Sequence, residues 1–470
     1  MGEILKTKTG DRGPGTGGGD SRVLVAGGTV WAPDGPRRAD VLVADGRVAQ
    51  VGDLSGWQGV AEVVDATGLH VLPGFIDVHV HVADRIGRFE LADDFASGSE
   101  VAVRNGITSL FAFATQRPGE SLAETAVRYR LRAEGHCHCD VGFHLTPTAT
   151  PWDWEAIERL VAAGWRTFKL YTTYRGAGLF SGWHEIEQAM WVIAGLGGRL
   201  LLHCEDDDVL ATVDAAGVDI SRPFSHTSLR PGSAEVEAVR CAVELAERTL
   251  CPLHVVHVST AAAAELIAGA RGRAPVTCET CPQYVLLTEE KLRGRWGYRY
   301  LCSPPLRGEA SRAGVEAMLV SGAIDLLATD HCAFRRDDKD DWSGDFRAVP
   351  SGLPGLGALV PLAYEVLVRR HALPLGELAL RLSANPARLV GLYPRKGAIA
   401  AGSDADIVVL DPGGPSRPLV STLADAHDPW NERKTTLRVR HVLLAGRRVV
   451  RDGLLLEADR PAGRLLAGPC

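Results

Sequence analysis

The stretch Leu72-Pro-Gly-Phe-Ile-Asp-Val-His-Val-His-Val82 places two histidines at the end of an apolar, β-branched run. In a β-strand His79 and His81 project from the same face, so the two rings can share one metal ion. The alternative is a half-buried strand with two histidines that bind only other protein groups. The residues that follow in the chain decide between these two interpretations.

The composition indicates a globular protein that lies outside several functional classes. Of its residues, 46% are hydrophobic and 23% charged, as in soluble globular proteins. With 470 residues, the chain is too long for one ordinary domain. With a net charge of -7, the chain lacks the excess of positive charge that binds nucleic acid or an anionic membrane surface. Ten scattered cysteines and a polar, glycine-rich start without an apolar signal stretch predict a cytoplasmic protein with reduced thiols.

Short β-rich pieces occur near both ends of the chain. Residues 1–21 cannot bury a core, and we expect a disordered tail there. Residues 22–70 and 395–460 both contain strand-like runs separated by Gly, Pro and Asp turns. The two ends therefore predict one small β-sandwich domain assembled from both.

Between these ends, residues 71–394 alternate apolar strand-like runs with amphipathic helical stretches, which is typical of parallel βα units. The predicted strands are 75–81, 107–113, 141–145, 167–171, 200–203, 253–258, 276–279 and 324–328. Eight such units predict an α/β fold, a TIM-type (β/α)8 barrel. Catalytic groups in that fold lie at the carboxyl ends of the strands.

The strand ends carry a set of residues that could bind metal: His79, His81, Lys169, His203, His257 and Asp330. Lys169 is unusual, because it is the only lysine between Lys8 and Lys291 in an arginine-rich chain. A buried amine can lose its proton, which a guanidinium cannot do. A neutral amine can capture carbon dioxide as a carbamate, an anionic ligand able to bridge two cations. The alternative is a lysine that reaches from a strand end to solvent.

A series of motifs in chain order resembles one known family. Besides Pro-Gly-Phe-Ile-Asp-Val-His-Val-His, it includes Arg166-Thr-Phe-Lys-Leu-Tyr-Thr-Thr-Tyr174, Leu202-His-Cys-Glu205, Val256-His-Val-Ser-Thr260, Glu279-Thr-Cys-Pro-Gln-Tyr284, Ser303-Pro-Pro-Leu-Arg307 and Thr329-Asp-His-Cys332. The series closes with Asn385-Pro-Ala-Arg-Leu and Gly402-Ser-Asp-Ala-Asp-Ile-Val-Val-Leu. The sequence resembles the cyclic amidohydrolases of the dihydropyrimidinase (hydantoinase) branch of the amidohydrolase superfamily, from about residue 23 to 450.

The resemblance implies a site with two divalent metal ions, most simply Zn²⁺, with Mn²⁺, Co²⁺ or Fe²⁺ as alternatives. His79, His81 and Asp330 would hold one ion and His203 and His257 the other, with carboxylated Lys169 bridging them. A homotetramer or a homodimer is also implied.

The resemblance further implies how a ring would be held and opened. Tyr174 would polarise the scissile carbonyl, and the backbone around Ser303 and Ser351 would hold the amide edges of the ring. Relatives usually carry asparagine at the position of Ser351. Two close cations lower the pKa of a shared water from about 15.7 towards neutrality, so that a bridging hydroxide can attack the carbonyl. Asp330 would take the proton and later deliver it to the ring nitrogen.

Three functions remain open. The first is hydrolysis of a neutral cyclic amide, such as a hydantoin, a dihydropyrimidine or a related imide or ureide. The second is a dihydroorotase or an allantoinase, and the third is a non-catalytic scaffold related to dihydropyrimidinase. The complete ligand set argues against the scaffold. Dihydroorotases carry an arginine two residues after the second histidine, where Ala83 stands here, followed by Asp84 and Arg85. The sequence therefore favours a neutral ring.

Overall fold

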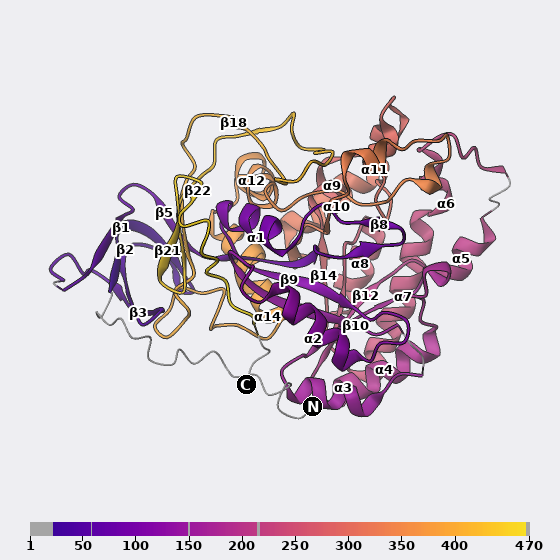
Figure 1. The fold of residues 1–470 in the computed structure, drawn as a ribbon, viewed down its shortest axis with the longest axis horizontal. Coiled ribbons are helices and arrows are strands. Elements are labelled where there is room, and N and C mark those ends of the chain that lie inside the picture. The colour runs from indigo at the N-terminus through magenta and orange to yellow at the C-terminus, as the bar shows by residue number, and fades with distance from the viewer. Residues whose placement is uncertain (1–21, 58, 149–150, 214–216, 467–470) are drawn as a thin grey trace.

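The computed structural model describes residues 22–57, 59–148, 151–213 and 217–466. The predicted tail, residues 1–21, lies outside them. Strands from both chain ends gather on one side of the molecule, and a barrel surrounded by helices forms the other side (Figure 1). Within the described ranges, no helix is both long and apolar enough to cross a membrane.

The barrel is a closed parallel sheet. Its successive strands are β6 (Phe75–His81), β9 (Ile107–Thr115), β10 (Asp140–Thr146), β11 (Thr167–Tyr171), β12 (Arg199–His203), β13 (Leu253–Val255), β14 (Val276–Thr280) and β15 (Leu326–Leu327). The segment that contains β15 continues into β16 (His331–Cys332). β15 pairs with β14 and β16 pairs with β6, so this one segment closes the ring. The fold is a TIM-type (β/α)8 barrel.

Helices connect the strands and cover the outside of the barrel (Figure 1). The longer ones are α1 (Phe95–Arg104), α2 (Leu122–Ala133), α3 (Trp154–Ala162), α4 (Trp183–Gly195), α7 (Gly232–Thr249), α8 (Ala261–Ala270) and α10 (Glu309–Ser321). After the last strand come α12 (Leu359–Ala363), η6 (Tyr364–Arg370), α13 (Gly376–Ala379), η7 (Leu380–Ala384) and α14 (Asn385–Leu389). Local capping begins α2: the Ser121 hydroxyl accepts from the Glu124 N–H at 3.2 Å, and the Glu124 carboxylate accepts from the Ser121 N–H at 2.8 Å.

Short elements lie in the loops between the strands and these helices. They are β7 (Arg85–Ile86), β8 (Phe89–Glu90), α5 (Asp207–Thr212), α6 (Ser225–Leu229), α9 (Pro282–Leu286), α11 (Arg336–Asp340), η1 (Arg175–Ala177), η3 (Glu289–Arg293), η4 (Gly297–Tyr300) and η5 (Phe346–Ala348). β7 and β8 form a hairpin directly after β6. Residues from several of these elements line one large cavity.

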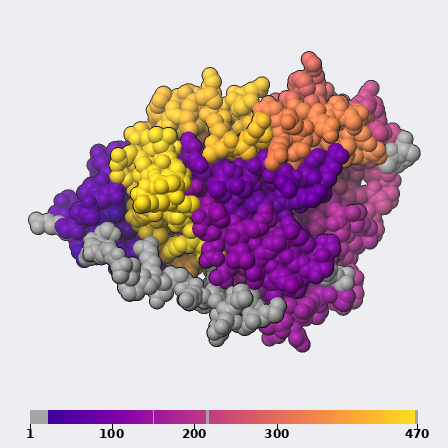
Figure 2. Space-filling model, viewed as in Figure 1, coloured from indigo at the N-terminus to yellow at the C-terminus, as the bar shows by residue number. Residues whose placement is uncertain are grey.

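The second sheet is built from both ends of the chain. Its order is β22 (Leu454–Leu455), β21 (Arg447–Arg451), β20 (Arg438–Leu444), β17 (Ile407–Asp411), β5 (His70–Pro73), β1 (Val23–Ala32), β2 (Gly35–Ala44) and β3 (Arg47–Gly52), with β4 (Glu62–Asp65) on β1. The two halves join where β5 and β17 pair antiparallel. Figure 2 shows the indigo and yellow ends of the chain together at one end of the molecule. A separate pair, β18 (Arg417–Pro418) and β19 (Lys434–Thr435), lies outside this sheet.

Two predicted strands are too long. Strand β13 ends at Val255 where the sequence predicted 258, and β15 covers only Leu326–Leu327 of the predicted 324–328. The backbone leaves the extended conformation near both ends, with φ of 40° at His257 and 49° at Asp330. Both residues line the cavity, so the chain turns where it brings them there.

Candidate functional site

The candidate site is a cavity of about 1490 Å³ at the carboxyl ends of the barrel strands. All the side chains singled out from the sequence line it: His79, His81, Lys169, Tyr174, His203, His257, Ser303, Asp330 and Ser351. The barrel strands and the loops that follow them bring these residues together from distant parts of the chain.

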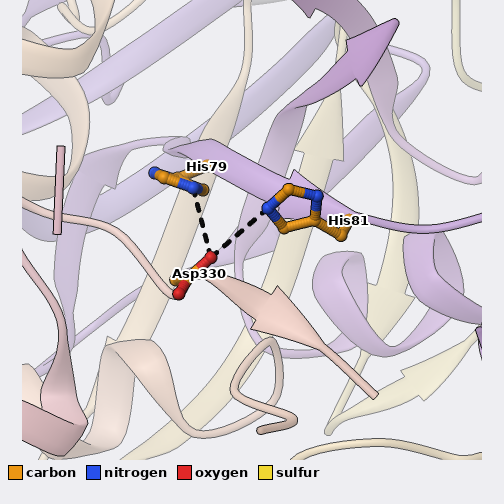
Figure 3. Close-up of side chains that lie close together, drawn as sticks. All are labelled: His79, His81 and Asp330. Carbon is orange, nitrogen blue, oxygen red and sulfur yellow. Dashed lines mark ion pairs between the residues drawn. The ribbon is translucent and has the colours of Figure 1, made fainter. Parts of the chain in front are cut away.

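Three of these side chains form a compact group that could hold a metal ion (Figure 3). The Asp330 Oδ1 atom lies 3.1 Å from His79 Nε2 and 3.4 Å from His81 Nε2. One ligand atom from each of the three residues lies within 4.8 Å of the others. His79 and His81 reach this point from alternate positions of β6, as the period of a strand requires. A shared ion can therefore be bound by two imidazoles and one carboxylate.

The charge state of Asp330 suits a metal ligand. Burial alone would raise the pKa of its carboxyl group, but His79 and His81 hold the pKa well below its usual range through charge and hydrogen bonds. The residue is thus an anion at neutral pH.

His203 and His257 form a second group beside the first. Their ring centroids are 4.5 Å apart, and the His257 ring is 5.3 Å from that of His79. His203 Nε2 lies 2.7 Å from the Glu205 carboxylate, which leaves Nδ1 as its ligand atom. His257 Nδ1 is buried without a hydrogen-bond partner in the described residues. Burial lowers the pKa of His203 to about 4 and that of His257 well below its usual value, so both rings are neutral.

Lys169 lies among these groups with its amine unpaired. The residue is 1% exposed, and Nζ has no hydrogen-bond partner in the part of the chain that is described. Burial lowers the pKa of the amine to about 8, although Glu279 and Asp330 oppose the shift. A lysine of this kind can lose its proton near neutral pH and react with carbon dioxide. Two buried nitrogens without partners, on Lys169 and His257, fit a site that is completed by cations.

Two buried glutamates orient the histidines, and both lie in motifs from which no role for them was predicted. Glu279 accepts a hydrogen bond from His79 Nδ1 and another from His254 Nε2, the latter at 3.0 Å. Glu205 does the same for His203. Carboxylates that bind the second ring nitrogen fix the tautomer and direction of a metal-binding imidazole. The only sequence signal for Glu205 is its position two residues after His203.

Arg230 is a further site residue that the sequence did not identify. Its guanidinium binds Glu205 through Nε at 3.0 Å and Nη2 at 2.5 Å. Its Cζ atom also lies 4.8 Å from the centroid of the Tyr174 ring. One arginine thus connects the residue that orients His203 with the tyrosine.

Tyr174 lies at the start of η1 in a left-handed conformation, with φ of 71°. Its ring centroid is 5.0 Å from that of His203. Burial raises the pKa of the phenol to about 12, so the hydroxyl keeps its proton and can donate a hydrogen bond. The segments of Ser303 and Ser351 lie next to each other, because the Gly352 N–H donates to the Leu301 carbonyl at 2.8 Å.

At the edge of the cavity next to His81, the position two residues after this histidine is an alanine. Ala83 and Asp84 both line the cavity there. The Asp84 carboxylate accepts a hydrogen bond from the hydroxyl of Tyr129. A carboxylate attached directly to a ring would therefore meet a negative charge.

A parallel (β/α)8 barrel with histidines, an aspartate and a buried lysine at its strand ends defines the class of metal-dependent barrel hydrolases. The model of the amidohydrolase family matches residues 188–449, and the chain belongs to this metal-dependent family.

Several characterised relatives are similar over nearly the whole chain. The D-hydantoinase of Streptomyces coelicolor is 35% identical over 450 residues, which cover 92% of this chain and 95% of that protein. The D-hydantoinase of Geobacillus stearothermophilus is 32% identical and covers 91% of this chain and 93% of its own length. The crystal structure of dihydropyrimidinase from Brevibacillus agri superposes with a TM-score of 0.90 at 31% identity, covering 95% of this chain and 98% of that one.

Proposed function

We propose that this protein opens a neutral cyclic amide, such as a hydantoin, a dihydropyrimidine or a related imide or ureide, by hydrolysis of a ring C–N bond. The relatives named D-hydantoinase and dihydropyrimidinase support this class of substrate. The single observation that carries the proposal is a buried, unpaired lysine amine among four histidines and an aspartate. That donor set suits a binuclear metal hydrolase.

His79, His81 and Asp330 would hold one divalent ion, and His203 and His257 the other, most simply zinc. Lys169, carboxylated by carbon dioxide, would supply the ligand that both ions share. When bound, such a pair of ions supplies a water whose pKa is lowered from about 15.7 to about 7.

The residues of the chain would carry the proton and hold the ring. Asp330 accepts the proton of the attacking water and donates it to the ring nitrogen as the C–N bond breaks. Tyr174 donates a hydrogen bond from its protonated hydroxyl to the carbonyl oxygen, where negative charge develops. The backbone around Ser303 and Ser351 would bind the amide edges of the ring.

The alternative within the same class is a dihydroorotase or an allantoinase. A panel of 5,6-dihydrouracil, hydantoin and dihydroorotate, given to protein loaded with zinc or manganese, separates the possibilities by loss of amide absorbance. We expect a much higher kcat/KM for the neutral rings than for dihydroorotate, because Ala83 offers no donor and Asp84 is negative. Faster turnover of dihydroorotate would move the assignment to the alternative. A purified protein that binds no metal would favour the scaffold instead.

We also infer two features of the whole molecule. The β-sandwich domain comprises residues 22–70 and 395–460, and the barrel domain residues 71–394. The assembly is a homotetramer or a homodimer, which sedimentation would measure.

A further inference from the structure

We propose that the ring itself is uncharged but carries a side chain that ends in a carboxylate, and that arginines at the mouth of the cavity bind this carboxylate. The inference rests on the proposed function and specifies its substrate class.

The cavity is larger than a bare ring needs. At about 1490 Å³ it exceeds the usual range for small-molecule sites, about 300–1,000 Å³. The candidate metal ligands His79 and Lys169 are buried. The loops that follow the strands form the outer part of the cavity. A ring placed at the ligands therefore leaves room for a side chain that extends towards solvent.

Exposed arginines line the cavity on one side of this outer part: Arg85, Arg117, Arg132 and Arg335. Arg335 follows β16, Arg85 follows β6, and Arg117 follows β9. These three strands are consecutive neighbours in the barrel. Arg132 lies on α2, three residues after Tyr129, whose hydroxyl binds Asp84 beside Arg85. The four arginines thus come from neighbouring segments that follow adjacent strands, on one side of the cavity.

None of these four arginines has an acidic partner among the described residues. The Nε atom of Arg85 donates to the Gly87 carbonyl at 3.1 Å. The guanidinium groups of Arg117, Arg132 and Arg335 form no hydrogen bond or ion pair within the described ranges. Elsewhere in this chain exposed arginines commonly pair with a carboxylate, as Arg240 does with Glu237 at 2.6 Å. Although the net charge of the chain is -7, these guanidinium groups at the mouth of the cavity pair with no carboxylate of the described residues.

Most acidic groups of the cavity already form hydrogen bonds with other protein groups. Asp93 accepts from the hydroxyls of Ser97 at 2.7 Å and Thr422 at 2.6 Å, and His331 Nε2 lies 3.1 Å away. Asp94 caps α1. Glu90 is exposed and lies opposite Arg85 in the β7–β8 hairpin, so it can offset one of the four cations. Apart from Glu90, these carboxylates have protein partners of their own, so the guanidinium groups of Arg117, Arg132 and Arg335 stay available to a ligand.

The forked guanidinium binds a carboxylate through two parallel hydrogen bonds, and unpaired cations at a mouth also attract anions from solution. Asp84 limits where the anion can be, because it lies three residues after His81. A carboxylate directly on the ring would lie near it. A carboxylate two or more carbons from the ring can reach the arginines instead.

The test compares two hydantoins that differ in charge but hardly in shape, 5-(2-carboxyethyl)hydantoin and 5-(2-carbamoylethyl)hydantoin, with metal-loaded protein. We expect kcat/KM to be about tenfold higher for the carboxylate, since hydrogen bonds to charged groups are the stronger ones. The advantage should shrink as ionic strength rises from about 0.1 M to 1 M, because the Debye length falls from about 10 Å to 3 Å. Calorimetry with the two ring-opened products gives the same comparison without turnover. Equal values, or a preference for the amide, would overturn the inference.

Variants connect the preference to the arginines. Replacing Arg117, Arg132 and Arg335 together with glutamine should remove most of the carboxylate advantage. The matched control replaces Arg37, Arg159 and Arg369, which are exposed and do not line the cavity, with the same change in net charge. A preference that survives in the first variant overturns the inference. If the protein hydrolyses dihydrouracil but shows no preference for the carboxylate, this inference is wrong and the proposed function is retained. If it hydrolyses none of the rings, both the proposed function and this inference are wrong.

Discussion

At the scale of single residues, Lys169 decides whether the cavity is a binuclear site. Its amine is 1% exposed and has no hydrogen-bond partner in the described part of the chain. We expect Lys169→Arg to abolish activity and the binding of paired metal ions, because a guanidinium keeps the charge but cannot form a carbamate. Metal content measured by atomic absorption, together with turnover of hydantoin, checks this.

Lys434→Arg is the matched control, because Lys434 is exposed and lies on β19 outside the cavity. It should retain both metal and rate. Lys169→Ala supplied with a short carboxylic acid should recover part of the rate. Two bound metals and normal turnover in Lys169→Arg would remove the bridging role from Lys169.

In the proposed reaction Asp330 would carry the proton. Asp330→Asn should lower kcat by about 10² or more, because a general base contributes about 10²–10⁴ in rate. KM should change less, since the ring would be held by other groups. Steady-state kinetics on hydantoin separates the two parameters. If kcat of Asp330→Asn equals that of the wild type, another group moves the proton.

The residues that the sequence proposed for metal and substrate all line one cavity, but the sequence did not identify the residues that orient them. His79 and Lys169 lie within recognisable strands, so period and fold predict which way they point. Arg230 precedes α7 in a long connection, and no pattern shows that it binds Glu205 and covers Tyr174. Such contacts depend on how loops fold back over the barrel, which hydrophobic periodicity does not encode.

At the scale of elements, periodicity predicted every barrel strand but made two of them too long. Both errors fall where His257 and Asp330 adopt positive φ. An apolar run continues in the sequence beyond Val255, but the backbone has already turned to present the histidine to the cavity. The local pattern favours a longer strand there, but the backbone turns and brings both residues to the cavity.

The packing of α10 against η6 gives a prediction on pH. Glu316 of α10 is 6% exposed and accepts hydrogen bonds from Arg312 at 2.5 Å, Arg370 at 2.7 Å and His371 at 2.9 Å. Burial alone would raise its pKa, but these partners lower the pKa to about 2. A lowered pKa stabilises the fold fully above the ordinary value of about 4.5, and this contribution is lost as the pH falls towards 2.

We therefore expect Glu316→Gln to lower the free energy of unfolding by about 2–3 kcal/mol at pH 7, and by progressively less below about pH 4.5. Urea unfolding of variant and wild type across this pH range measures the difference. Glu309→Gln on the same helix is the control, because its carboxylate is 69% exposed and should matter little. A difference that does not change with pH would mean that packing, and not charge, accounts for the loss.

At the scale of the whole molecule, a buried charge cluster joins the barrel to the sheet of the two chain ends. Lys396 donates to Asp140, at the start of β10, at 2.7 Å and also to Asp406, just before β17. Arg464 binds Asp140 as well, through Nη2 at 2.8 Å. The repeated β-rich pattern predicted that both chain ends share a domain. It could not predict this cluster, because its members are polar residues far apart in sequence that meet only after folding.

The cluster gives the last prediction. Lys396 is 1% exposed, so Lys396→Met would leave Asp140 and Asp406 buried with one cation fewer. Breaking a buried ion pair by removing one partner costs about 3–5 kcal/mol, and we expect the midpoint of urea unfolding to fall accordingly. Lys434→Met, at an exposed lysine, should leave the midpoint unchanged. Adding Asp140→Asn to Lys396→Met should recover part of the loss, because the second change removes a buried charge that has lost its partner. If the double variant is less stable by the full sum of the two single changes, the cluster does not act as one unit between the two parts of the molecule.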